Sequence, residues 1–140
     1  MMQLYISGNS PYARKVRIVA RETGLAAQIE EITVSGFEQL QEAGPGAKIP
    51  VLVCEDGARL CESLIITRYL NELSMGKLLP KEPGQLTRCL EIESTASTLL
   101  DSIFARSLEN NQRKENERSS TILEREKNRT ARCLDRLNEL

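Results

Sequence analysis

The sequence predicts a small α/β domain in the first part of the chain and an all-helical region in the rest. Three observations support this prediction. Strand and helix patterns follow the order β-α-β-α-β-β-α, a segment with two prolines and a glycine then interrupts them, and beyond it the apolar residues keep only helical spacing. The expected domains are therefore residues 1–78 and 86–140, joined by a linker at 79–85.

The α/β pattern opens with a β-α-β unit. Residues 3–7 favour a short strand, and Ser10 followed by Pro11 favours a helix start, because Ser can cap the helix and Pro needs no N–H there. Gly24 is a typical helix end, and residues 28–34 favour a second strand. A unit of this kind predicts two parallel strands with a right-handed crossover.

The pattern continues with a short helix, a hairpin and a longer helix. Residues 37–43 favour one or two helical turns. The apolar run 51–54 favours a buried strand, and the Asp-Gly pair at 56–57 predicts a turn that returns residues 59–61 antiparallel to it. The last helix of this domain begins at Ser63, and its apolar face consists of Ile65, Ile66, Tyr69, Leu70 and Leu73.

Beyond the linker the sequence predicts two amphipathic helices. Residues 106–120 are mostly polar and are expected to form a helix end and a loop. With no further helices to cover them, the apolar faces are expected to be exposed and to favour dimerisation or aggregation. The first helix carries Ile92, Ala96, Leu99, Leu100, Ile103 and Phe104, and the second carries Leu123, Thr130, Leu134, Leu137 and Leu140.

Composition excludes several classes of function. The 140 residues include 19 Lys+Arg, 20 Asp+Glu and no His, for a net charge of -1. Without His there is no His-ligated zinc and no Ser-His-Asp triad, and we expect no metal. The near-zero charge argues against a general nucleic-acid binder. No apolar run is long enough to span a bilayer, and the N-terminus lacks a signal peptide, so we expect a cytoplasmic protein without a membrane partner.

The four cysteines show no metal or redox spacing. They lie at 54, 61, 89 and 133, and no pair is separated as in a C-x-x-C motif. We expect reduced thiols packed as small apolar residues. Cys61 is notable because it lies beside one of the motifs described next.

The first motif is Ser10-Pro11-Tyr12-Ala13, at the turn from strand to helix. In a thioredoxin-like fold this turn holds the redox dithiol, but here Ser10 and Ala13 occupy the two cysteine positions, so thiol–disulfide exchange is excluded. The Ser10 hydroxyl, beside a helix N-terminus, could donate a hydrogen bond to a bound thiolate and lower the pKa of its thiol. Taken alone, Ser10 is better explained as a helix N-cap and nothing more.

The second motif is the Ile49-Pro50 step before the buried strand. A proline there removes a ladder donor and often follows a cis bond, which would leave the N–H and C=O of Ile49 free for an extended peptide. The third motif is Glu62-Ser63 at a helix start, where Ser63 can bind an anion and Glu62 an ammonium group. Alone, these are an edge proline and a capped helix.

Together, the motifs resemble the N-terminal domain of bacterial soluble glutathione S-transferases across residues 1–80. Leu79-Pro80 and the long helix after it resemble the family's linker and the start of its helical domain. The resemblance therefore implies a thioredoxin-like domain followed by an incomplete helical domain. The matching stretches are Ser10-Pro11-Tyr12-Ala13-Arg14-Lys15-Val16, Gly44-Pro45-Gly46-Ala47-Lys48-Ile49-Pro50-Val51-Leu52, Asp56-Gly57 and Glu62-Ser63.

The resemblance also implies a function and its residues. Glutathione would be the co-substrate, no cofactor would be bound, and its thiolate would attack an electrophilic small molecule in a homodimeric enzyme. The glutathione-binding residues it implies are Asn9, Lys48, Ile49, Pro50, Glu62 and Ser63. Ser10 would face the sulfur as the catalytic residue, and Tyr5 is a rival for that position because some classes use a tyrosine.

Two departures and one alternative accompany this resemblance. Gly44 and Gly46-Ala47 differ from the family's N-P-x-G pattern, and only the first two helices of its second domain are expected, which puts activity in question. The alternative is a non-catalytic adaptor of the stringent starvation protein A type, which contacts RNA polymerase, or an inactive truncated relic.

Overall fold

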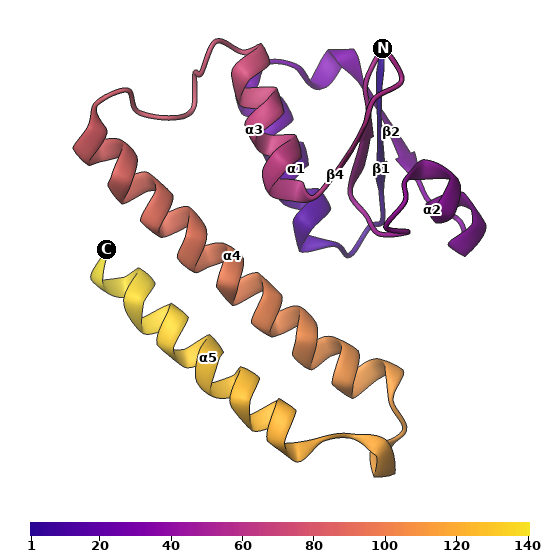
Figure 1. The fold of residues 1–140 in the computed structure, drawn as a ribbon, viewed down its shortest axis with the longest axis vertical. Helices are drawn as coiled ribbons and strands as arrows, with labels where there is room; N and C mark the ends of the chain where they lie inside the picture. The colour runs from indigo at the N-terminus through magenta and orange to yellow at the C-terminus, as the bar shows by residue number, and fades with distance from the viewer. The chain divides into compact units, whose positions relative to one another are not determined.

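The computed structural model describes all residues 1–140 and divides into two units, Met1–Leu79 and Pro80–Leu140 (Figure 1). The first unit is a four-stranded mixed sheet with helices, and the second consists of helices alone. No helix in either unit combines the length and the apolar character needed to cross a bilayer.

The sheet of the first unit has the strand order β2-β1-β3-β4. β1 runs parallel to β2, as the predicted β-α-β unit requires, and antiparallel to β3, which in turn pairs antiparallel with β4. The strands are β1 Met2–Ile6, β2 Ile29–Thr33, β3 Val51–Val53 and β4 Arg59–Cys61.

Helices cover both faces of this sheet. α1 and α3 pack side by side on one face, and α2 lies on the other (Figure 1). Gly24 ends α1 in the left-handed conformation (φ 80°), where its N–H donates to the carbonyls of Ala20 and Arg21. The bounds are α1 Pro11–Thr23, the 3₁₀ turn η1 Ala26–Gln28, α2 Phe37–Ala43 and α3 Ser63–Leu73.

The core of this unit lies between the sheet and the α1–α3 layer. Alternate residues of β1 are buried, as expected for a strand with one face against helices. The fully buried large apolar side chains of this core are Leu4, Val16, Leu52, Ile66 and Leu70.

The second unit is an antiparallel helix pair, α4 Pro83–Gln112 and α5 Ser120–Glu139, with the 3₁₀ turn η2 Glu115–Glu117 between them (Figure 1). Glu82 caps α4, because its carboxylate accepts hydrogen bonds from the N–H groups of Gly84 and Gln85 at 2.8 and 2.7 Å. Residues 106–120 form the end of α4, which continues to Gln112, and the connection to α5, in agreement with the predicted helix end and loop.

The α4–α5 pair buries polar groups as well as Cys133, which the apolar spacing did not predict. Ser102 is fully buried, and its hydroxyl donates to the Glu126 carbonyl at 2.7 Å. The Glu126 carboxylate is itself buried and accepts hydrogen bonds from Arg125 and Arg129 at 2.8 and 2.6 Å. Several residues of the predicted stripes are exposed, as expected for helices without further helices to cover them: Ile92, Ile103, Phe104 and Leu134.

The Gly44→Ala substitution is expected to destabilise the first unit by about 1–3 kcal/mol, the usual cost of overpacking. A Cβ at Gly44 would lie 2.9 Å from Cys61 Sγ and 3.2 Å from a Val51 methyl carbon, inside a buried site. The matched control is Gly46→Ala in the same loop, where no atom lies within 4 Å of the added Cβ. Urea unfolding of both variants measures the difference, and equal midpoints would contradict this account of Gly44.

Acidification is expected to weaken the α4–α5 pair through Glu126. Burial raises the pKa of Glu126, but hydrogen bonds from Arg125 and Ser102 and the charges of Arg129 and Arg125 hold it below the ordinary value of 4.5. A carboxyl whose folded-state pKa is lowered adds stability above its unfolded-state pKa, and that stability is lost as the pH falls through the folded-state pKa.

Urea unfolding monitored by helical circular dichroism at about pH 7 and below pH 4.5 tests this dependence. Glu126→Gln should flatten the pH dependence, whereas Glu124→Gln, on the exposed face of the same helix, should leave it unchanged. Equal losses of stability on acidification in all three proteins would show that Glu126 is not the responsible group.

Candidate functional site

Three turns that carry the predicted site residues meet at one end of the sheet. In the β1–β3 pair Tyr5 lies opposite Val51, and in the β3–β4 pair Val51 lies opposite Cys61. Because both pairs are antiparallel, the C-terminal end of β1, the N-terminal end of β3 and the C-terminal end of β4 lie at the same end of the sheet. Register thus brings residues 9–10, 48–50 and 62–63 to one region.

The turn after β1 ends in a capped helix. Ser10 has an extended backbone, and its Oγ accepts a hydrogen bond from the Ala13 N–H at 3.2 Å. This bond uses a lone pair of the hydroxyl oxygen, so the hydroxyl hydrogen remains available as a donor. The N-cap role and a donor role are therefore compatible at Ser10. Asn9 precedes it and is exposed.

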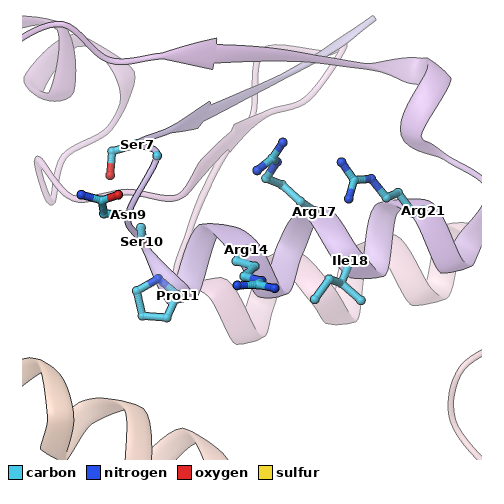
Figure 2. A pocket seen from close by; sticks show the side chains of 9 residues that line it. Ser7, Asn9, Ser10, Pro11, Arg14, Arg17, Ile18 and Arg21 are labelled. Carbon is cyan, nitrogen blue, oxygen red and sulfur yellow. The ribbon is translucent and has the colours of Figure 1, made fainter.

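A surface hollow lies beside this turn and extends along α1 as far as Arg21. We call it the arginine hollow, and Figure 2 shows the side chains along it. Asn9 and Ser10 therefore share it with three cations that are not among the predicted site residues. The lining residues are Ser7, Gly8, Asn9, Ser10, Pro11, Arg14, Arg17, Ile18 and Arg21.

One of the three arginines is neutralised and two are not. Arg17 Nε donates to Glu31 Oε1 on β2 at 2.8 Å, and this hydrogen bond, with the charge of Glu31, raises the pKa of Arg17. Arg14 and Arg21 form no ion pair. The sequence did carry a signal for this cluster, because positions 10, 14, 17 and 21 follow helical spacing from the N-cap.

The turn before β3 presents an unpaired peptide group. The Ile49–Pro50 bond is cis, and Pro50 is buried directly before the first residue of β3. The backbone N–H and C=O of Ile49 form no hydrogen bond within the chain. Lys48, next to it, is exposed and forms no ion pair. An extended peptide could therefore pair with Ile49 at this edge.

The turn after β4 holds Glu62 in an uncommon backbone conformation. Its φ of 88° and ψ of 116° lie in a region that residues other than glycine rarely adopt, and its side chain makes no capping bond to α3. The Glu62 carboxylate is exposed and forms no ion pair, and Ser63 is 3% exposed. The first α3 bond runs from Ile66 N–H to the Glu62 carbonyl, which leaves the Ser63 N–H available for an anion.

The other residues considered from the sequence lie outside the arginine hollow. Lys48, Ile49, Pro50, Glu62 and Ser63 reach the same sheet edge but do not line the arginine hollow. Tyr5 lies within β1, opposite Val51, and not in the turn that carries Ser10. All four cysteines are free, and no group of His, Cys, Asp and Glu side chains is placed to hold a metal ion.

Two curated relatives match about two thirds of the chain. The uncharacterized GST-like protein YibF of Escherichia coli (strain K12) is 31% identical over 102 residues, 71% of this chain and 50% of that protein. A stringent starvation protein A homolog of Coxiella burnetii is 36% identical over 91 residues, 64% of this chain and 43% of that protein. The chain thus spans about half the length of the curated relatives it matches.

A family model and a solved structure extend these matches. The model described as "Glutathione S-transferase, N-terminal domain" matches residues 9–73. The crystal structure of a glutathione S-transferase from Methylobacillus flagellatus with glutathione bound is 31% identical, covering 99% of this chain and 69% of that one, with a TM-score of 0.85. The predicted thioredoxin-like domain followed by a helical domain is confirmed, and the chain belongs to the glutathione S-transferase family.

Proposed function

We propose that this chain binds glutathione along the end of its sheet and activates the thiol for attack on an electrophilic small molecule. The observation that carries the proposal is the meeting, at one sheet edge, of the Ser10 hydroxyl, the unpaired peptide group of Ile49 and the Glu62-Ser63 pair. The bound glutathione in the Methylobacillus flagellatus relative supports the same ligand.

Glutathione has a chemical group for each of these turns. Its cysteinyl unit is an extended peptide that can exchange main-chain hydrogen bonds with Ile49. Its γ-glutamyl end carries an ammonium group for Glu62 and a carboxylate for Ser63 at the N-terminus of α3. The exposed Lys48 ammonium lies beside Ile49 and is suited to the glycyl carboxylate. Pro50 and Asn9 shape the two turns on either side of the thiol.

The backbone of Glu62 supports a binding role for this turn. A non-glycine residue at a φ of 88° costs of the order of 1–3 kcal/mol and persists only where the surrounding fold enforces it. Here β4 ends at Cys61 and α3 begins at Ser63, so both neighbours of Glu62 are held in regular structure. The conformation directs the Glu62 carboxylate to solvent, where no residue of this chain neutralises it.

Ser10 is the residue proposed to act on the thiol. Its hydroxyl hydrogen can donate to the sulfur while its oxygen keeps accepting from Ala13 N–H. A donor at the positive end of α1 favours the thiolate over the thiol and so lowers the thiol pKa. The thiolate then attacks the electrophilic carbon, forming a C–S bond as the leaving group departs with its electron pair.

The proposal includes a homodimer in the cytoplasm. Glutathione chemistry of this kind needs a reducing compartment, and all four cysteines are free. Exposed apolar side chains on both units, among them Ile65, Leu73 and Phe104, are suited to a contact between copies of the chain. Light scattering that gives the mass of a monomer would contradict the dimer.

A non-catalytic adaptor is the second candidate, favoured by the 36% identity to the stringent starvation protein A homolog. The two candidates differ in the molecules that the chain binds and in whether it transfers a thiol. An adaptor would capture a protein partner in a pull-down and transfer no thiol, whereas a transferase would be retained on glutathione-agarose. No retention with millimolar glutathione would overturn the binding proposal.

Replacing Ser10 by Ala is expected to raise the thiol pKa of bound glutathione and to slow thiol transfer roughly tenfold or more, as for loss of one preorganised donor. Loss of the cap should also destabilise α1 by about 1 kcal/mol. Ser10→Thr keeps both the cap and the donor, so it should restore the low thiol pKa. The thiol pKa of bound glutathione is obtained from thiolate absorbance against pH for the unchanged chain and both variants. If Ser10→Ala leaves this pKa unchanged, Ser10 does not act on the thiol.

Replacing Glu62 by Gln is expected to weaken glutathione binding by about five- to tenfold, because the ammonium group loses its charged partner. Glu72→Gln, near the exposed far end of α3, is the matched control and should bind like the unchanged chain. Isothermal titration with glutathione measures both. If both variants lose equal affinity, the effect is a general one of charge and Glu62 does not contact the ligand.

A further inference from the structure

The arginine hollow carries positive charge that the proposed glutathione site does not use. Its lining includes Arg14, Arg17 and Arg21 and no acidic residue. Glu31 neutralises Arg17 from β2, at 2.8 Å, but no carboxylate approaches Arg14 or Arg21. Two guanidinium groups therefore face the hollow without a counter-charge.

The cations follow the same face of α1 as the proposed thiol-facing residue. Ser10, Arg14, Arg17 and Arg21 are spaced at i, i+4, i+7 and i+11, so they form one row along the helix. With a rise of about 1.5 Å per residue, Arg14 lies about 6 Å and Arg21 about 16 Å along the axis from Ser10. Figure 2 shows this row with Ser7 and Asn9 at its Ser10 end.

Apolar side chains accompany the row. Pro11 and Ile18 line the same hollow, and Ile18 is 48% exposed, so its apolar surface is open to a ligand. Figure 2 shows Pro11, Arg14 and Ile18 in order along one side of α1. The lining therefore suits a molecule with an apolar body and an anionic end, and a purely inorganic anion would leave Pro11 and Ile18 unused.

We propose that the electrophile is an organic anion, with its reacting carbon at Ser10, its apolar body on Pro11 and its carboxylate on Arg14, while Ile18, which lies beyond Arg14 along α1, contacts only longer members of the class. Arg21 serves longer members of the class. This assignment rests on the proposed function and adds the substrate class to it. With a benzylic chloride as the electrophile, the glutathione thiolate forms a C–S bond to the benzylic carbon, chloride leaves with the bonding electrons, and the thiol proton passes to solvent.

The kinetic test compares the rates at which the protein conjugates 4-(chloromethyl)benzoate and its methyl ester. Each rate is divided by the rate at which the same compound reacts with glutathione without protein. The unchanged chain should favour the acid, and Arg14→Gln should reduce the acid-to-ester preference about five- to tenfold, as for one charge-assisted hydrogen bond at a partly exposed site. Arg68→Gln, an exposed arginine on α3 outside the hollow, is the control and should keep the preference. An equal preference in Arg14→Gln and the unchanged chain would overturn the assignment.

A binding test separates this assignment from the proposed function. The full chain is titrated with unreactive 4-methylbenzoate and, separately, with neutral 4-methylbenzamide, and the arginine Nε–H signals are followed by NMR. The site is supported if the Arg14 Nε–H signal shifts with 4-methylbenzoate and does not shift with 4-methylbenzamide. Equal shifts with both compounds overturn it. Glutathione binding without benzoate binding rejects the acidic electrophile and leaves the proposed function standing. Benzoate binding without glutathione binding rejects the transferase and assigns the hollow to a free organic anion.

Discussion

The antiparallel pairing of β3 with both β1 and β4 is the constraint on which the candidate site depends. β3 has only three residues, so both of its partners are fixed by the same short ladder. Ser10, Ile49 and Glu62 come from turns far apart in sequence, and this ladder alone brings them to one edge. The close approach of Gly44 to Val51 and Cys61 seats the loop that enters β3, which explains why a glycine occupies that position.

Each turn of the site uses a group that the fold leaves unsatisfied. The Ser10 oxygen caps α1, yet its hydrogen stays available, and the peptide group of Ile49 lies just outside the β3 ladder. Glu62 is held at a positive φ between a strand and a helix, with its carboxylate in solvent. A fold that satisfied these groups internally would be more stable, but it would offer a peptide ligand no donor, acceptor or charge.

The helical unit is built on a different principle from the α/β unit. The α/β core consists of apolar side chains, whereas the α4–α5 pair buries Ser102, which bonds to the Glu126 carbonyl of α5, and a Glu126 carboxylate held by two arginines of α5 itself. A buried carboxylate is tolerated here because every oxygen has a charged hydrogen-bond donor. Apolar residues of the same helix pair, such as Ile103 and Phe104, are exposed.

Most of the α/β unit could be predicted from local patterns. The Ser10-Pro11 start, the Gly24 end and the Asp-Gly hairpin act through the backbone conformation of a few neighbouring residues, and such signals are legible along the chain. The three motifs likewise gave the family, because each is a short run with a fixed residue order. The face by which α4 meets α5 and the conformation of Glu62 were not predicted. They depend on which residues from distant segments share a space, and spacing within one helix does not specify its partner.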